Sequence, residues 1–212
     1  AGHSLGEYTA LAVAGALSVS ETAKLVEERG RLMQRACEMK PGTMAAIIGL
    51  DQMTVEEISR QTGTYVSNVN TGDQVVISGE VLAVARALDL ASSRGAKRAI
   101  PLRVAGAFHS SLMSPARDGL EKIVDGLDLT DPVIPIIANM TARPMTTANE
   151  LRQELVTQIC ECVQWKKSVE FMVESGVSSF VEIGPGKTLS AMVKRIDKSV
   201  KTSTVSDMAA VS

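Results

Sequence analysis

Gly2-His3-Ser4-Leu5-Gly6 opens the chain, and an almost wholly apolar stretch follows through residues 7–17. This stretch leaves little polar face, so it predicts a buried helix. A serine between two glycines at the entrance to a buried helix is typical of the strand–turn–helix elbow that presents a hydroxyl as a nucleophile. We predict that Ser4 is this nucleophile and that the Leu5 backbone N–H faces the developing oxyanion. The alternative is a glycine-flanked turn in which Ser4 only caps the helix.

A serine nucleophile needs a base, and the chain contains two histidines. Histidine suits this role because its pKa lies near neutral pH. His3 sits on the turn itself, beside Ser4, so His109 is the better candidate. It follows Phe108 and a run of small residues, 104–107, which lets backbone and ligand approach closely. The alternative is a histidine of the core or of a loop.

Arg29 lies on the apolar face of a helix expected from Ser20, its predicted cap, to Cys37. The polar face of that helix consists of Lys24, Glu27, Glu28, Arg31 and Arg35. A buried guanidinium needs a partner, which is either an internal acid or the carboxylate of a ligand. An arginine that reaches solvent from the edge of the apolar stripe is a third possibility. Periodicity leaves these interpretations open.

No acidic residue plainly completes a Ser–His–Asp triad in this sequence. A main-chain carbonyl could orient the imidazole instead. A helix expected over residues 148–162 leaves its last carbonyls without helical partners, and Gln158 carries the first of them.

The middle of the chain predicts a separate unit with strands and helices in the order βαββαβ, a ferredoxin-like arrangement. Its expected elements span residues 44–50, 54–61 (a helix capped by Thr54), 65–70, 74–78, 81–94 and 98–104. Helices and strands then alternate over 111–126, 133–138, 148–162, 168–174, 178–183 and 187–194. Alternation predicts an open, mostly parallel sheet. We therefore expect an α/β core of residues 1–40 and 110–212, with residues 41–109 inserted.

Composition excludes several classes of protein. A net charge of −2 and 3% aromatic residues do not suit nucleic-acid binding. No apolar run approaches the roughly 20 residues that span a bilayer. The three cysteines form neither a disulfide framework nor a CxxC pair, which favours a reducing compartment.

Three further patterns resemble known sites only in part. Gly186-Lys187-Thr188 resembles the end of a phosphate loop, but Val181 stands where the required glycine belongs. Cys160 and Cys162 have no further Cys or His nearby, so we expect packed thiols and no metal. A basic group, which is either a solvated face or a docking site for an acidic partner, comprises Lys166, Lys167, Lys187, Lys194 and Arg195.

Taken together, the motifs resemble the malonyl-CoA:acyl-carrier-protein transacylase family in order through nearly the whole chain. They are GHSLGEY (2–8), EERGRLM around Arg29, NVNTGDQVVISG (68–79), GAFHSSLM (106–113), VQWKKSVEFM (163–172) and EIGPGKTL (182–189). The resemblance implies an α/β-hydrolase-like core with a ferredoxin-like subdomain inserted between nucleophile and base.

The resemblance also implies the chemistry. Ser4 would carry the malonyl group, His109 would act as base, and Arg29 would bind the malonate carboxylate. Gln158 would offer its main-chain carbonyl to the imidazole, and Leu5 would supply an oxyanion donor. Phe108 resembles the malonyl-selecting version of its segment. Transfer would be ping-pong, from malonyl-CoA to the phosphopantetheine thiol of acyl carrier protein, without a metal or redox cofactor.

Several expectations accompany this resemblance. The family's N-terminal GQGxQ segment is absent, so we expect a truncated chain that folds poorly and transfers little malonate alone. We expect a soluble monomer of the bacterial cytoplasm or plastid stroma. The parent is either a stand-alone enzyme of fatty acid synthesis or a domain of a polyketide or multidomain fatty acid synthase. A serine thioesterase or hydrolase, or a non-catalytic module that binds carrier protein, are the competing functions.

Overall fold

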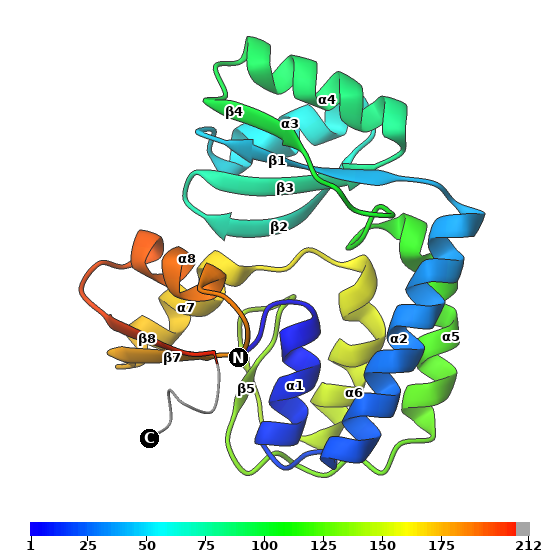
Figure 1. Ribbon diagram of the computed structural model, residues 1–212, viewed down its shortest axis with the longest axis vertical. Helices are drawn as coiled ribbons and strands as arrows, with labels where there is room; N and C mark the ends of the chain where they lie inside the picture. Colours follow the sequence, from blue (N-terminus) through cyan, green and yellow to red (C-terminus); the bar gives the residue numbers. More distant parts are fainter. Residues whose placement is uncertain (207–212) are drawn as a thin grey trace.

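Residues 1–206 are described by the computed structural model, which shows a sheet unit above a group of packed helices (Figure 1). The chain starts where these parts meet. The helix α1 (Leu5–Val13) descends from that point, and α2 (Val19–Met39) climbs back toward the sheet unit. The nucleophile motif therefore lies at the junction between the two parts.

The sheet unit comprises β1 (Thr43–Ile48), α3 (Gln52–Thr62), β2 (Tyr65–Thr71), β3 (Gln74–Gly79), α4 (Val81–Ser93) and β4 (Arg98–Pro101). All of its strand pairs are antiparallel, in the order β2-β3-β1-β4. Both helices cover the same face of the sheet (Figure 1). Between sheet and helices lies an apolar core that includes Ile47, Ile58, Ile77 and Ala87. The sequence predicted these six elements in this order.

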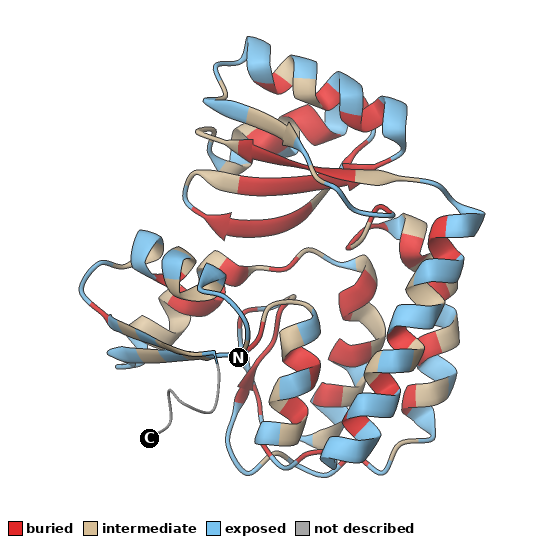
Figure 2. Ribbon diagram, viewed as in Figure 1, coloured by how far each residue is buried: buried red, intermediate tan, exposed pale blue. Residues whose placement is uncertain are grey.

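The helical group consists of α1, α2, α5 (Ser114–Asp125) and α6 (Ala148–Thr157). Their inner faces pack around Tyr8, Leu25, Leu120 and Leu151, and Figure 2 shows these faces as buried. A short 3-10 helix, η1 (Ser111–Met113), leads into α5, and η2 (Gln158–Cys160) continues α6.

The mostly parallel sheet that helix–strand alternation predicted is not formed by the described residues. Here β5 (Ile136–Ile137) pairs antiparallel with β6 (Pro144–Met145), and only β7 (Ser179–Ile183) and β8 (Lys201–Val205) pair in parallel. Proline lacks the N–H that a ladder needs, and Pro132 and Pro135 confine the strand expected over 133–138 to two residues. The polar β8 was not predicted.

Several predicted boundaries were also wrong. The cap of α2 is Ser18 rather than Ser20, and the cap of α3 is Asp51 rather than Thr54, whose N–H the Asp51 carboxylate accepts. The helix expected over 148–162 ends as an α-helix at Thr157. Two later helices, α7 (Trp165–Glu174) and α8 (Thr188–Ile196), complete the fold. Across residues 1–206, every helix is too short or too polar to cross a bilayer.

Candidate active site

Ser4 occupies a strained turn at the start of α1. Its φ of 51° and ψ of −103° lie where side chains rarely go, at a cost of about 1–3 kcal/mol. Both of its backbone groups are held by side chains. The N–H donates to Asn139 Oδ1 at 2.7 Å, and the carbonyl accepts from Gln158 Nε2 at 2.9 Å. The turn is thus fixed by tertiary contacts, and the hydroxyl remains free to face His109.

His109 lies against this hydroxyl, with Nε2 2.8 Å from Ser4 Oγ. Its Nδ1 is 2.9 Å from the Gln158 carbonyl oxygen and 3.0 Å from that of Glu161. Carbonyls only accept, so Nδ1 carries the hydrogen and Nε2 is left to accept the serine proton. Burial is the main reason that the pKa of His109 falls to about 4, and the Arg29 charge adds to the effect. The imidazole is therefore neutral at neutral pH.

Arg29 completes the cluster from the buried face of α2. Its Nη2 donates to Ser4 Oγ at 3.0 Å and lies 3.4 Å from Gln158 Oε1, and its guanidinium carbon is 4.9 Å from the centre of the Tyr8 ring. Only 6% of the residue is exposed. Within residues 1–206 no carboxylate forms an ion pair with it, so the internal-acid interpretation is wrong.

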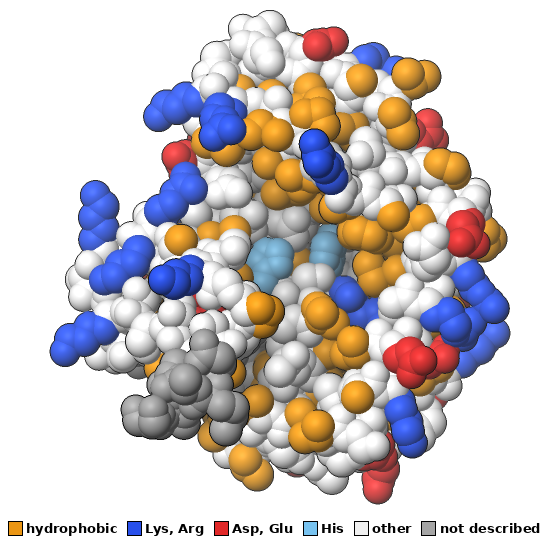
Figure 3. Space-filling model, in the orientation of Figure 1, with side chains coloured by type: hydrophobic (Ala, Val, Ile, Leu, Met, Phe, Trp, Pro, Cys, Tyr) orange, Lys and Arg blue, Asp and Glu red, His pale blue; other side chains and the backbone are white. Residues whose placement is uncertain are grey.

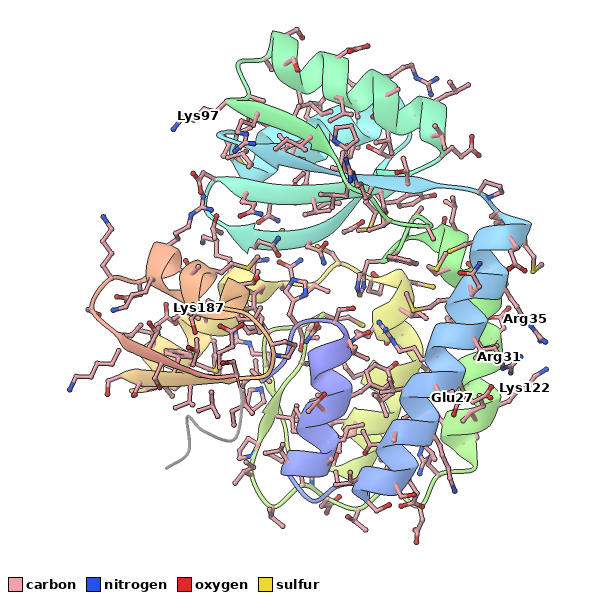
Figure 4. The ribbon with its side chains drawn as sticks, in the orientation of Figure 1. Glu27, Arg31, Arg35, Lys97, Lys122 and Lys187 are labelled. Carbon is pink, nitrogen blue, oxygen red and sulfur yellow. The ribbon has the colours of Figure 1, made fainter. Side chains whose placement is uncertain are left out.

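The opposite face of α2 behaves as the sequence predicted. Glu27, Arg31 and Arg35 point outward from α2, near Lys122 of α5 (Figure 4). Arg31 pairs there with Glu28 at 2.5 Å. The helix thus separates its solvated charges from the one cation that it directs inward toward Ser4.

Leu5 and Phe108 flank the cluster. Leu5 is the first residue of α1, where an amide has no helical acceptor, and 48% of the residue is exposed. Phe108 is partly buried and packs on the core residues beside β1 and α2. Its carbonyl lies 3.0 Å from the Ser67 hydroxyl. His109 follows with a φ of 55°, so His109, like Ser4, has a strained backbone.

The residues predicted for the site therefore come together. Ser4 and His109 are 105 positions apart in the sequence, yet they are in contact. Arg29 contacts Ser4, the Gln158 carbonyl contacts His109, and the side chains of Arg29 and Gln158 face each other. Figure 3 shows the two histidine side chains in a hollow of the surface, rimmed by hydrophobic side chains. The hollow therefore brings together a hydroxyl, a neutral imidazole and a guanidinium that has no ion-pair partner within residues 1–206.

Comparison with known proteins assigns this constellation to a family. The model of the "Acyl transferase domain" family matches residues 1–211. The chain belongs to the acyl transferase domain family.

Two comparisons extend the assignment of this acyl transferase domain. The "Malonyl CoA-acyl carrier protein transacylase" of Bacillus subtilis is 42% identical over 98% of the chain and 67% of that protein. The acyl-carrier-protein S-malonyltransferase structure from Bartonella henselae superposes with a TM-score of 0.95, at 40% identity over 99% of the chain and 68% of that protein.

A malonyl-transacylase solved in complex with its type II PKS acyl-carrier protein is also similar to the acyl transferase domain. It has a TM-score of 0.93 and 40% identity, over 99% of the chain and 69% of that protein. The chain thus spans about two thirds of the length of these relatives.

Sequence reasoning missed part of the site of this acyl transferase domain. Asn139 accepts the Ser4 N–H, and Glu7 in turn accepts the Asn139 backbone N–H at 2.7 Å. Glu7 is the one charged residue of α1, and a charge inside an apolar helix was the available signal. The second carbonyl at His109, from Glu161, was not predicted either. His3 turns away from Ser4, with Nε2 3.0 Å from Asn70 Oδ1.

The phosphate-loop resemblance fails for a structural reason. Glu182 places its own carboxylate at the start of α8, where it accepts the Leu189 N–H at 3.0 Å and the Ser190 N–H at 2.7 Å. An internal anion thus occupies the position that a phosphate would need. Residues 1–206 also hold no group of three or more His, Cys, Asp or Glu side chains placed to bind a metal ion.

Proposed function

We infer that this acyl transferase domain moves a malonyl group from malonyl-CoA to the phosphopantetheine thiol of acyl carrier protein, for fatty acid synthesis. The observation that carries this function is the contact of Ser4 Oγ with both His109 Nε2, at 2.8 Å, and Arg29 Nη2, at 3.0 Å. A nucleophile, its base and a carboxylate-binding cation within one cluster match an acyl group that carries its own negative charge.

In the first half-reaction, Ser4 Oγ attacks the thioester carbonyl while His109 Nε2 takes the hydroxyl proton. The oxyanion that forms faces the Leu5 N–H at the start of α1. The carbon–sulfur bond then breaks, and the CoA sulfur leaves with the proton from His109. A malonyl ester of Ser4 remains, with its free carboxylate at the Arg29 guanidinium.

The second half-reaction reverses these steps. The phosphopantetheine thiol gives its proton to His109, its sulfur attacks the ester carbonyl, and Ser4 leaves with the proton. Both steps exchange one acyl bond for another, so their balance requires no metal or redox cofactor. We assign the Gln158 carbonyl to orienting His109, and Phe108 to selecting the malonyl group from its position next to the base.

We also propose that residues 1–40 and 110–212 form an α/β-hydrolase-like core, of which residues 207–212 lie outside the described part. Residues 41–109 would be the inserted ferredoxin-like subdomain. The strand order β2-β3-β1-β4 with two helices on one face supports this subdomain. The elbow into α1 and the parallel pair β7–β8 support the core.

We propose that carrier protein docks on the basic side of the molecule. Two of its cations have acidic partners, since Lys166 pairs with Glu170 and Arg195 with Asp73. Lys187, at the start of α8, and Lys97, before β4, are both exposed (Figure 4). Exposed cations of this kind steer an acidic partner toward the site.

One labelling experiment tests the function. After incubation of the purified protein with malonyl-CoA, mass spectrometry should find a malonyl adduct on Ser4, and carrier protein should remove it. Ser4→Ala should form no adduct. Absence of an adduct on the unaltered protein, once circular dichroism shows that it is folded, would refute the proposal.

Acetyl-CoA provides the second arm of this experiment, because an acetyl group lacks the carboxylate. Arg29→Ala should lower the rate of malonylation by about 10- to 100-fold, as expected when a charged hydrogen bond of about 1.5–3 kcal/mol is lost. Its rate with acetyl-CoA should change far less. A hydrolase of neutral esters, the competing function, predicts the same effect on both thioesters and free acid in place of a stable adduct.

A further inference from the structure

Glu7 is a buried carboxyl group to which the two half-reactions assign no role. It belongs to the first turn of α1, and 1% of the residue is exposed. Within residues 1–206 it has no cation within ion-pair distance. Burying such a group without a strong set of hydrogen bonds costs several kcal/mol. Its partners therefore need to be identified.

Amide groups from two distant segments satisfy Glu7. Its Oε1 accepts the Asn139 backbone N–H at 2.7 Å and the Asn139 side-chain amide at 3.0 Å. Its Oε2 accepts Gln158 Nε2 at 2.7 Å. Burial, followed by the neighbouring Glu154, raises the pKa of Glu7, and burial also raises the pKa of Glu154. The hydrogen bonds that Glu7 accepts from Asn139 and Gln158 oppose this shift and favour the ionised carboxylate.

The same two side-chain amides hold the nucleophile. Asn139 Nδ2 donates to the Gly2 carbonyl at 2.7 Å, while Asn139 Oδ1 accepts the Ser4 N–H at 2.7 Å. Gln158 Nε2 donates to the Ser4 carbonyl at 2.9 Å, and Gln158 Oε1 faces Arg29 Nη2 at 3.4 Å. Each NH2 group thus uses one hydrogen for Glu7 and the other for the elbow.

Glu7 therefore holds both amides in the orientation that the elbow and Arg29 also require. An amide has a donating and an accepting end, and its orientation follows from its partners. Because the Glu7 oxygens accept, each NH2 group must face them. The oxygen atoms are then directed at the Ser4 N–H and at Arg29. A flipped Asn139 amide would set oxygen against oxygen at Glu7 and leave the Ser4 N–H without an acceptor, and a flipped Gln158 amide would set its oxygen against Glu7 and the Ser4 carbonyl.

We propose that Glu7 is a positioning residue for acyl transfer: it orients Asn139 and Gln158, and through them the Ser4 elbow and the Arg29 guanidinium. It touches no reacting atom. The inference rests on the proposed function for its kinetic consequence. Its structural consequence, the pairing of the Ser4 N–H, holds whatever the substrate.

Glu7→Gln tests this proposal because it keeps the shape of the side chain and replaces one acceptor by a donor. At least one neighbouring amide must then turn or lose its bond. We expect Ser4 malonylation to slow by about 100-fold, the cost of a misplacement of about 1 Å. The preference for malonyl-CoA over acetyl-CoA should fall as Arg29 loses its place. Hydrogen exchange of the Ser4 amide should become faster.

Thr62→Val is the control, since Thr62 is also a buried polar residue but lies at the end of α3, in the sheet unit. Its Oγ1 donates to the Ile58 carbonyl at 2.8 Å and lies 3.2 Å from Thr64 Oγ1. This variant should lower the melting temperature while it leaves malonylation, thioester preference and Ser4 exchange near those of the unaltered protein.

The outcomes separate the two proposals. Suppose that the unaltered protein forms no malonyl adduct, but only Glu7→Gln makes hydrogen exchange of the Ser4 amide faster. The positioning role then stands and the substrate assignment fails. If Ser4 exchange is unchanged in Glu7→Gln, or if both variants slow malonylation equally, the positioning role is refuted.

Discussion

At the scale of single residues, burial keeps the His109 imidazole neutral, with Nε2 unprotonated at neutral pH. Only 4% of the residue is exposed, and desolvation disfavours the imidazolium form. The carbonyls of Gln158 and Glu161 fix the hydrogen on Nδ1, which a carboxylate does in Ser–His–Asp enzymes. A neutral carbonyl stabilises the imidazolium less than an acid would, so this base stays neutral well below pH 7.

The acid limb of the pH profile follows from this environment. As pH falls through the His109 pKa of about 4, Nε2 becomes protonated and can no longer take the Ser4 proton. We expect kcat/KM for malonyl-CoA to fall with a midpoint well below 6.5, the ordinary histidine pKa. Initial rates between pH 3.5 and 8, with stability checked at each pH, measure it. A midpoint near 6.5 would contradict the burial argument.

The same group affects stability with a defined sign. Between about pH 6.5 and 4 the unfolded chain binds a proton at this histidine and the folded chain does not. The free energy of unfolding should therefore decrease as pH falls through this window.

At the scale of elements, the entrance to α1 depends on one of its two glycines. A Cβ on Gly2 would lie 2.0 Å from the Gly6 carbonyl carbon and 2.1 Å from its oxygen. These are backbone atoms of the next turn and cannot give way. A Cβ on Gly6 would meet nothing within 4 Å. The two glycines of the motif therefore differ in function, although the sequence presents them alike.

Paired alanine substitutions test this difference. Gly2→Ala should destabilise the fold by about 3 kcal/mol or more, since overpacking against backbone has no flexible side chain to relax it. Gly6→Ala should leave the free energy of unfolding unchanged or raise it by up to about 1 kcal/mol, because alanine favours a helix. Urea unfolding of both variants measures the two values. Equal losses would show that the close approach at Gly2 does not limit the turn.

At the scale of the whole molecule, hydrogen bonds from β2 connect the sheet unit to the segments around His109. Val163 N–H donates to the Ser67 carbonyl, and Val69 N–H donates to the Val163 carbonyl, both at 2.9 Å. These bonds hold the segment whose carbonyls orient His109. The buried Ser67 hydroxyl lies 3.0 Å from the Phe108 carbonyl and 2.6 Å from the Ser78 hydroxyl. The sheet unit thus contacts both the residue before His109 and the segment whose carbonyls face its imidazole.

Ser67→Ala should therefore weaken catalysis from outside the cluster. Loss of one hydrogen bond of about 1 kcal/mol predicts roughly fivefold slower malonylation of Ser4. Ser59→Ala is the matched control, because Ser59 is buried in the same unit and its hydroxyl has no partner among the described residues. Stopped-flow acylation of both variants would compare them, and equal rates would remove Ser67 from the positioning of His109.

Local sequence predicted much of this molecule. Hydrophobic periodicity is a property of neighbouring residues, so it identified the six elements of the sheet unit and the inward direction of Arg29. The motif around Ser4 predicts a nucleophile from neighbouring residues alone. The first residue of α2 was predicted wrongly, because Ser18 and Ser20 both carry a hydroxyl that can cap a helix.

The sequence by itself determined which groups could react: a serine on a tight turn, a histidine outside that turn and an arginine on an apolar face. Only the tertiary structure decided what those groups contact. Among residues 1–206 it left Arg29 without an acidic partner, gave His109 two carbonyls, and placed Glu7 against the side chains that hold Ser4. The physical reason is that a hydrogen bond depends on separations of about 3 Å, and packing alone brings residues as distant as Ser4 and Gln158 to that separation.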